Sequence, residues 1–296
     1  MNGPKKIEGI LAALVTPFDD KGDLDVERAR AHLERLIEVG IHGFYVGGST
    51  GEGMFQSVDE RCEYMRFVAD VAQGRVLLIA QVGSLSSRDV HALAEFASTN
   101  DYDAISSTPP FFFNHSDAEI VDYYRDLAEC SDLPVLLYNI PGLTGRSLPM
   151  ATQKEMLSIP NVVGSKHTDP NLFSAERLLR EMPSAAVFNG FDEMLTGGLA
   201  MGMVGGIGST YNLMPKHYLD IYDAVGAGDL DRARQSQAIV NEVIEELIRV
   251  SPGVTPAIKL GLRQLGFDMG EARRPFLPIS GDTARFEELL LNSDGI

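Results

Sequence analysis

The chain contains 296 residues, of which 44% are hydrophobic and 23% are charged, the balance expected of a soluble globular protein. That length fits either one large α/β barrel or two ordinary domains. The formal net charge of −17 argues against nucleic acid and against an anionic membrane surface as partners.

Short apolar runs rich in β-branched residues alternate with amphipathic helical stretches along most of the chain. In segment 25–39, for example, apolar residues recur at helical spacing between glutamates and arginines. The runs predicted to be strands are 10–16, 43–47, 76–82, 104–107, 135–139, 162–166, 186–189 and 205–208. Eight strands alternating with helices predict a (β/α)8 TIM barrel, with the parallel sheet covered on both faces. An open, doubly wound α/β sheet is the structural alternative.

The strand pattern stops after the eighth run. Segments 218–225, 230–250 and 255–265 have helical periodicity, with breaks at Gly226-Ala-Gly228 and Ser251-Pro-Gly253. We therefore predict a barrel over residues 1–212 and a C-terminal helical extension over residues 213–296 that packs on it.

Polar and hydroxyl side chains follow five of the predicted strands. The carboxyl ends of barrel strands form the face on which catalytic groups gather, so residues from separate strands are expected to meet there. The five segments are Gly47-Gly-Ser-Thr-Gly-Glu-Gly53, Tyr138-Asn-Ile-Pro-Gly142, Lys166-His-Thr168, Asn189-Gly-Phe-Asp-Glu193 and Gly206-Ile-Gly-Ser-Thr-Tyr-Asn212.

Lys166 is the only lysine that ends an apolar, strand-like run. Low dielectric at the end of a buried strand favours the neutral amine. A neutral amine attacks a ketone and forms a Schiff base, so Lys166 indicates covalent carbonyl catalysis. The alternative is a structural lysine that reaches solvent or pairs with a carboxylate.

The glycine loop, residues 47–53, predicts an anion site. Its glycines allow close backbone approach, its N–H groups can surround an anion, and Ser49 and Thr50 add hydroxyl donors. The loop lacks the Gly-Lys-Ser/Thr of a P-loop, so a small carboxylate suits it better than a nucleotide. A plain glycine turn is the alternative.

Other candidate groups follow the fifth and seventh strands. Tyr138 could move a proton between substrate oxygens, or it could only anchor packing. Asp192 and Glu193 would suit the hydroxyl groups of a polyol, although helix capping is equally plausible for one of them. The histidines show no metal spacing, so we assign no metal.

These segments together resemble the N-acetylneuraminate lyase family, in the class I aldolase superfamily shared with dihydrodipicolinate synthase. The resemblance runs over nearly the whole chain. It rests on Tyr45-Val-Gly-Gly-Ser-Thr-Gly-Glu52, Tyr138-Asn-Ile-Pro141, the Lys166 segment, Asn189-Gly-Phe-Asp-Glu193 and Gly205-Gly-Ile-Gly-Ser-Thr-Tyr-Asn212. It implies a barrel with a helical extension, usually assembled as a homotetramer.

The resemblance also implies residue roles. Lys166 would form the Schiff base and Tyr138 would carry the proton, so no cofactor is expected. Ser49 and Thr50 would hold the pyruvate carboxylate. The residues implied to meet the sugar-derived part of the substrate are Thr168, Gly190, Asp192, Glu193 and Ser209.

Two positions bear on the subfamily. The synthase branch has an arginine two residues after the proline of its Tyr-Asn-x-Pro motif, where this chain has Leu143, so the synthase interpretation weakens. Many relatives carry a tyrosine after Thr-Pro on the fourth strand, supplied to a neighbouring subunit as part of a proton relay. Here the sequence is Thr108-Pro-Pro-Phe-Phe-Phe113, which offers no phenol. A relay would then run through Tyr138 and Thr50 with water, or the reaction would differ from the family's usual one.

The implied reaction is reversible cleavage of N-acetylneuraminate to pyruvate and N-acetylmannosamine, with a small keto or sugar acid as the partner. A sibling aldolase, hydratase or synthase acting on another 2-keto acid is an alternative, and a barrel that binds such an acid without turnover is a remote one. Cys62 and Cys130 need no disulfide, and the first six residues lack the apolar core of a signal peptide. We therefore expect a cytoplasmic protein.

Overall fold

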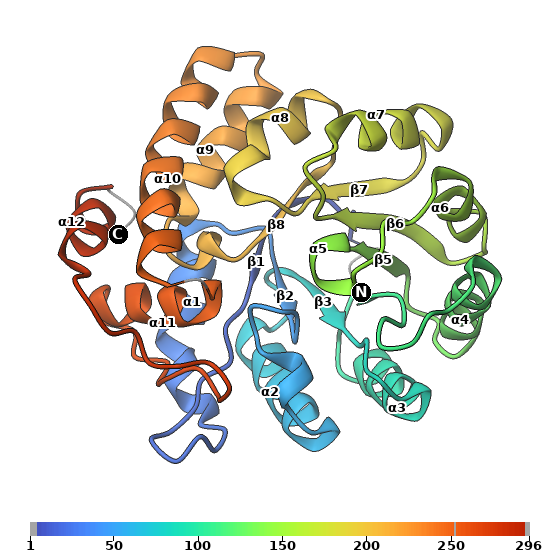
Figure 1. Ribbon diagram of the computed structural model, residues 1–296, viewed down its shortest axis with the longest axis horizontal. Coiled ribbons are helices and arrows are strands. Elements are labelled where there is room, and N and C mark those ends of the chain that lie inside the picture. The colour runs from blue at the N-terminus through green and yellow to red at the C-terminus, as the bar shows by residue number, and fades with distance from the viewer. Residues whose placement is uncertain (1–4, 252, 294–296) are drawn as a thin grey trace.

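The computed structural model describes residues 5–251 and 253–293. Its eight parallel strands pair in chain order and close into a barrel (Figure 1). The strands are β1 Gly9–Ala13, β2 Gly43–Val46, β3 Leu77–Gln81, β4 Ala104–Ser107, β5 Val135–Asn139, β6 Val162–His167, β7 Ala186–Asn189 and β8 Gly205–Gly208. The predicted barrel is confirmed, and the open-sheet alternative is wrong. Residues 1–4 of the predicted N-terminal start, and Pro252 of the second predicted helix break, lie outside the described residues.

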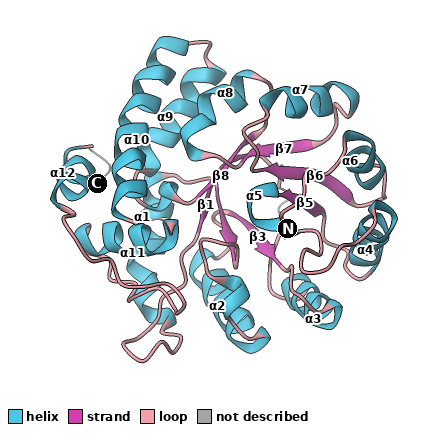
Figure 2. Cartoon of the chain, viewed as in Figure 1, coloured by secondary structure: helices cyan, strands magenta, loops and turns pink. Residues whose placement is uncertain are grey.

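Helices surround the strands, as Figure 2 shows in cyan around magenta. Between strands lie α1 Arg30–Val39, α2 Val58–Ala72, α3 Ser87–Ser98, α4 Asp117–Glu129, α5 Pro141–Thr144, α6 Met150–Leu157, α7 Leu172–Glu181 and α8 Leu195–Ala200. After β8 come α9 Pro215–Gly226, α10 Leu230–Val250, α11 Val254–Gln264 and α12 Ala284–Asn292. Helix α9 packs against β1, α1 and α8, while α10 packs against α9, α11 and α12. The predicted boundary at residue 212 falls between β8 and α9.

Local sequence explains where several elements begin. Helices α2 and α4 both start with a capping box, in which Ser57 pairs with Glu60 and Ser116 with Glu119. The predicted helix 25–39 instead begins as a 3-10 turn, Val26–Ala29, before α1. Helix α12 was not predicted, because its amphipathic pattern is short and its buried residues are only Phe286 and Leu290.

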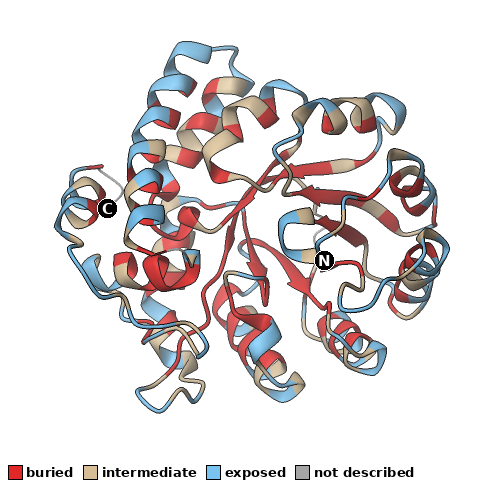
Figure 3. Ribbon diagram, viewed as in Figure 1, coloured by how far each residue is buried: buried red, intermediate tan, exposed pale blue. Residues whose placement is uncertain are grey.

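The hydrophobic core has two layers that follow the alternation of the strands. Leu136 and Tyr138 of β5 belong to the cluster inside the barrel, whereas Leu137 between them packs toward the helices. Figure 3 shows the strands as almost entirely buried. Lys166 is aligned with Tyr138 on β5 and with Phe188 on β7, both of which are members of the inner cluster. Strand register therefore directs the Lys166 side chain into the barrel.

Among the described residues, no helix combines the length and the apolar content that crossing a bilayer requires.

Candidate active site

A cavity of about 510 Å³ lies at the carboxyl ends of the strands. Every site residue predicted from the sequence lines it, although the residues come from five different strand ends. These residues are Ser49, Thr50, Tyr138, Lys166, Thr168, Gly190, Asp192, Glu193 and Ser209. The predicted convergence on one face of the barrel is therefore observed in the structure.

The floor of the cavity holds the predicted nucleophile between two aromatic rings. Lys166 is 4% exposed, and its Nζ lies 4.5 Å from the ring centroid of Tyr45 and 4.4 Å from that of Tyr138. The two rings meet edge to face, with centroids 5.9 Å apart. Lys166 forms no ion pair within the described residues. The amine is thus held by rings rather than by a carboxylate, which leaves it available to react.

Tyr45 packs against Lys166 from within the barrel, and sequence reasoning gave it no role. Its hydroxyl donates to Ser106 Oγ at 3.1 Å, and burial raises the pKa of Tyr45 well above its ordinary value. In the sequence Tyr45 is only the first residue of the motif that runs to Glu52. Strand alternation could have identified it, because it lies two residues before Gly47 on the inward row of β2.

The glycine loop is folded so that its donors stay free. The backbone N–H groups of Ser49 and Thr50 have no hydrogen-bond acceptor within the described residues. The carbonyl oxygen of Gly51, by contrast, is engaged by Thr16 Oγ1 at 2.6 Å and by Gln56 Nε2 at 2.6 Å. Two neighbouring N–H groups and two hydroxyls at a cavity wall form the type of anion site that the sequence predicted.

A buried arginine lies behind the glycine loop. The Nη1 of Arg61, on α2, donates to the Gly83 carbonyl at 3.0 Å, and Nη2 donates to the Gln81 side chain at 2.9 Å. Its Nε has no acceptor among the described residues and would lie 3.7 Å from a Cβ built on Gly47. Burial lowers the pKa of Arg61 to about 10, so the guanidinium remains charged at neutral pH. It is a positive charge behind the loop without a carboxylate partner among the described residues.

Asp192 connects the ends of β7 and β8. Its Oδ2 accepts hydrogen bonds from the Thr210 backbone N–H at 2.7 Å, from Thr210 Oγ1 at 2.6 Å and from Ser209 Oγ at 3.3 Å. Burial raises the pKa of Asp192, and these bonds oppose the shift. A Cβ on Gly208 would lie 2.0 Å from Asp192 Oδ1, so glycine is required there. One carboxylate oxygen therefore organises the β8 loop.

Glu193 is half-buried at the same wall. Burial raises the pKa of Glu193, and the neighbouring Asp192 carboxylate adds to the shift. Helix α10 supports this turn from outside, because Gln237 Nε2 donates to the Asp192 carbonyl at 3.1 Å and Asn241 Nδ2 donates to the Glu193 carbonyl at 3.3 Å.

Thr168 and Gly190 form a closely fitted pair. Thr168 Oγ1 is buried and has no hydrogen-bond partner within the described residues. A Cβ at Gly190 would lie 1.9 Å from that oxygen, so only glycine leaves room for the hydroxyl. An unsatisfied buried hydroxyl beside a cavity is well placed to bond a bound molecule.

Helices α10 and α11, with the loop after α11, supply a wall that sequence reasoning missed. Its residues are apolar apart from Thr255, and they carry no chemical motif that could have revealed them. They are Ile244, Leu247, Ile248, Val254, Thr255 and Phe276. Leu143 of α5 also lines the cavity and is 65% exposed.

Phe112 and Phe113 are 71% and 72% exposed, and neither lines this cavity. No group of three or more histidine, cysteine, aspartate or glutamate side chains in the described part of the chain is arranged to hold a metal ion.

The profile of the dihydrodipicolinate synthetase family matches residues 6–291. An N-acetylneuraminate lyase of Rhizobium meliloti (strain 1021) is 43% identical over 285 residues, which cover 96% of this chain and 94% of that protein. N-acetylneuraminate lyase 2 of Escherichia coli O6:H1 is 39% identical, with 93% and 90% covered.

Two solved structures superpose closely on this chain. The structure of CdNal from Clostridium difficile in complex with mannosamine superposes with a TM-score of 0.94 at 29% identity, covering 98% of this chain and 100% of that one. The sialic acid aldolase of Ruminococcus gnavus gives a TM-score of 0.92 at 28% identity, covering 98% of each chain.

Proposed function

This chain belongs to the dihydrodipicolinate synthetase family, and from that premise we propose that it is a carbon–carbon lyase that cleaves N-acetylneuraminate reversibly to pyruvate and N-acetylmannosamine. One observation carries the proposal. The buried Lys166 amine lies against the Tyr138 ring at neighbouring strand ends, in a chain 43% identical to a named N-acetylneuraminate lyase.

The chemistry begins with the carboxylate and ketone of the open-chain sugar acid. The free N–H groups and hydroxyls of Ser49 and Thr50 bind the carboxylate. The Lys166 amine then attacks the C2 ketone, and loss of water gives a protonated imine. The imine withdraws electrons from C3 and supplies the electron sink itself, so the cleavage requires no cofactor.

Cleavage follows at the C3–C4 bond. Tyr138 accepts the proton of the C4 hydroxyl as this bond breaks, which releases the aldehyde of N-acetylmannosamine and leaves a pyruvate enamine on Lys166. Protonation at C3 and hydrolysis of the imine then release pyruvate and restore the amine. The wall formed by Thr168, Asp192 and Glu193 meets the hydroxyl groups of the sugar-derived part.

A sibling activity on another 2-keto acid is the second candidate. Leu143 argues against the synthase chemistry within this group, because an apolar side chain cannot bind a second substrate carboxylate. The aromatic residues Phe111, Phe112 and Phe113 carry no hydroxyl for a relay, and this observation favours testing other sugar acids.

Trapping with borohydride tests the proposal. After incubation with N-acetylneuraminate and borohydride, peptide mapping should find a reduced, pyruvate-sized adduct on Lys166. Lys166→Ala should fold and give no adduct, whereas Tyr138→Phe should form the imine but cleave about 10²-fold more slowly. An adduct from pyruvate but not from N-acetylneuraminate would move the substrate to a sibling acid. Absence of both adducts would refute the lysine chemistry.

Assembly and location complete the proposal. We infer a homotetramer by analogy with the family, and a cytoplasmic enzyme from the low cysteine content. Sedimentation analysis measures the number of subunits, and cell fractionation measures the location of the enzyme.

A further inference from the structure

Helix α11 reaches the glycine loop at two points that lie one helical turn apart. Thr255 Oγ1 donates to the Thr50 carbonyl at 3.4 Å, and Lys259 Nζ lies 2.8 Å from Oε1 of Glu52. Residues four apart share one face of a helix, so both contacts come from the same face of α11. The loop that carries the predicted carboxylate donors is therefore held by the C-terminal helices as well as by the barrel.

The Lys259–Glu52 ion pair is sealed from water. The two side chains are 2% and 0% exposed, respectively. Burial lowers the pKa of Lys259, and Glu52 opposes the shift. A buried ion pair contributes little net stability, because desolvation offsets the attraction, whereas removing one partner leaves a costly buried charge. Folding stability alone therefore does not explain the Lys259–Glu52 pair, and its position beside the glycine loop points to a role in that loop.

Glu52 is held in a backbone conformation that disfavours a glutamate. Its φ is 58°, in the left-handed region, and this turn directs the chain from Thr50 into Gly53. The carboxylate is held by one hydrogen bond and one ion pair: Oε2 accepts the Arg273 backbone N–H at 2.7 Å, and Oε1 lies 2.8 Å from Lys259 Nζ. The side-chain contacts thus hold the turn that presents the loop to the cavity.

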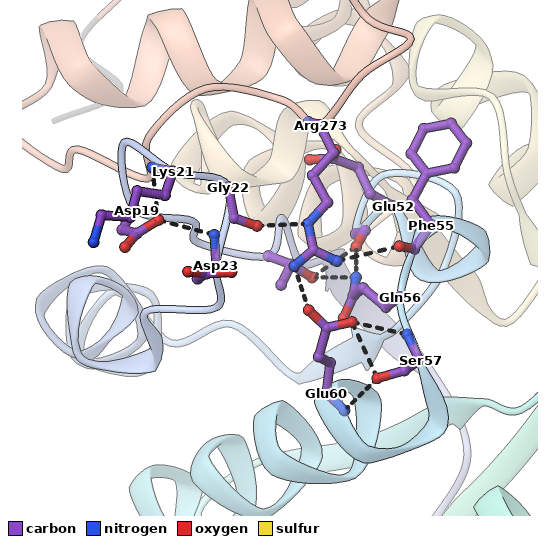
Figure 4. A network of polar contacts seen from close by, with 12 residues as sticks. Asp19, Lys21, Gly22, Asp23, Glu52, Phe55, Gln56, Ser57, Glu60 and Arg273 are labelled. Carbon is purple, nitrogen blue, oxygen red and sulfur yellow. Dashed lines mark hydrogen bonds and ion pairs between the residues drawn. The ribbon is translucent and has the colours of Figure 1, made fainter.

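Arg273 extends the same attachment. Its Nη1 donates to the Phe55 carbonyl at 3.1 Å, and its Nη2 pairs with Glu60 of α2. Figure 4 shows the Arg273 side chain extending to Phe55 and Glu60, while its backbone N–H meets the Glu52 carboxylate. The C-terminal segment therefore contacts the C-terminal end of the glycine loop, immediately after the residues that face the cavity.

The charge of Glu52 matters for an anionic substrate. Glu52 lies two residues from Thr50, so an unpaired carboxylate there would repel a substrate carboxylate at the loop. We propose that Lys259 is a positioning residue for the carboxylate of the keto acid: it neutralises Glu52 and, with it, holds the glycine loop in its binding conformation. This inference rests on the proposed keto-acid site and adds that the C-terminal helices complete it.

Pyruvate trapping measures this role without the sugar. In Lys259→Met the stem of the side chain remains but the charge is lost. We expect the pyruvate concentration that gives half-maximal borohydride trapping to rise about tenfold, the scale of one pKa unit of interaction. The trapping rate at saturating pyruvate should change less than about twofold, because Lys166 is untouched.

Two further variants separate charge from folding. Glu52→Gln/Lys259→Met removes both charges and leaves no buried ion, so its half-saturating pyruvate concentration should return to within about threefold of native. This variant carries the test if the single variant is unstable. Arg263→Met is the matched control, one turn further along α11, where the arginine pairs with the exposed Asp268 and Glu271; its trapping should be native.

Three results would overturn the assignment: native half-saturation in Lys259→Met, an equal rise in Arg263→Met, or a double variant as weak as the single one. A native protein that traps no pyruvate would instead sink the proposed function. The two failures are therefore distinguishable.

Discussion

Replacing Gly53 by alanine tests whether the glycine loop must close as tightly as the structure shows. A Cβ at Gly53 would lie 2.1 Å from the carbonyl oxygen of Gly47, whereas ordinary contact begins at 3.4 Å. The two backbone segments would have to separate by about 1.3 Å, the difference between these distances. A displacement of about 1 Å at a positioning group costs about 10²-fold in rate. We expect kcat/KM for N-acetylneuraminate to fall by about that factor.

The assay is pyruvate release under steady-state conditions, with thermal unfolding measured in parallel. Gly226→Ala is the control, because nothing lies within 4 Å of a Cβ built at the end of α9 and this position is outside the cavity. The control should keep native kcat/KM. A folded Gly53→Ala variant with native kcat/KM would refute the reasoning, because the loop would then tolerate the displacement.

Asp192→Asn should lower kcat/KM for N-acetylneuraminate about 10- to 100-fold, because it weakens hydrogen bonds to a charged acceptor, each of which contributes about 1.5–3 kcal/mol. Pyruvate trapping by the same variant should stay near native. An equal loss of kcat/KM and of pyruvate trapping would contradict this prediction. Burial lowers the pKa of His32 to about 3, from 6.5 for an unperturbed histidine. Below about pH 6.5 the unfolded chain therefore binds a proton that the folded chain does not. The unfolding free energy should fall by about 1.4 kcal/mol for each unit by which the pH decreases in this range. Denaturant unfolding at about pH 7.5 and about pH 5.5 measures this slope, and an unchanged slope in His32→Gln would exclude His32 as its source.

Strand alternation explains why much of the site was predictable. A barrel strand sends alternate side chains inward, so the apolar run that ends at Lys166 already indicates which way the lysine points. Tyr138 is the penultimate residue of the neighbouring strand β5 and lies in register with Lys166. The rule that catalytic groups lie at the carboxyl ends of the strands then brings both residues to one cavity. These inferences need only local periodicity and the order of the strands.

The residues that were missed depend on contacts between distant parts of the chain. Thr255 and Lys259 belong to α11, whose periodicity predicts a helix but does not indicate which residue on the barrel its face will meet. Lys259 lies in a helical stretch of the sequence, and nothing in that pattern shows that the lysine is buried.

Glu52 shows how a motif can conceal a physical role. In the sequence it is one letter of the glycine loop, and the glycines and hydroxyls beside it have the more obvious anion chemistry. In the structure it is the residue with a left-handed backbone and a buried carboxylate that meets Lys259. A carboxylate placed next to a site for carboxylates is unfavourable unless a cation compensates it. The glycine loop and α11 therefore act as one unit: the negative charge of Glu52, which holds the turn, requires the positive charge of Lys259 to neutralise it.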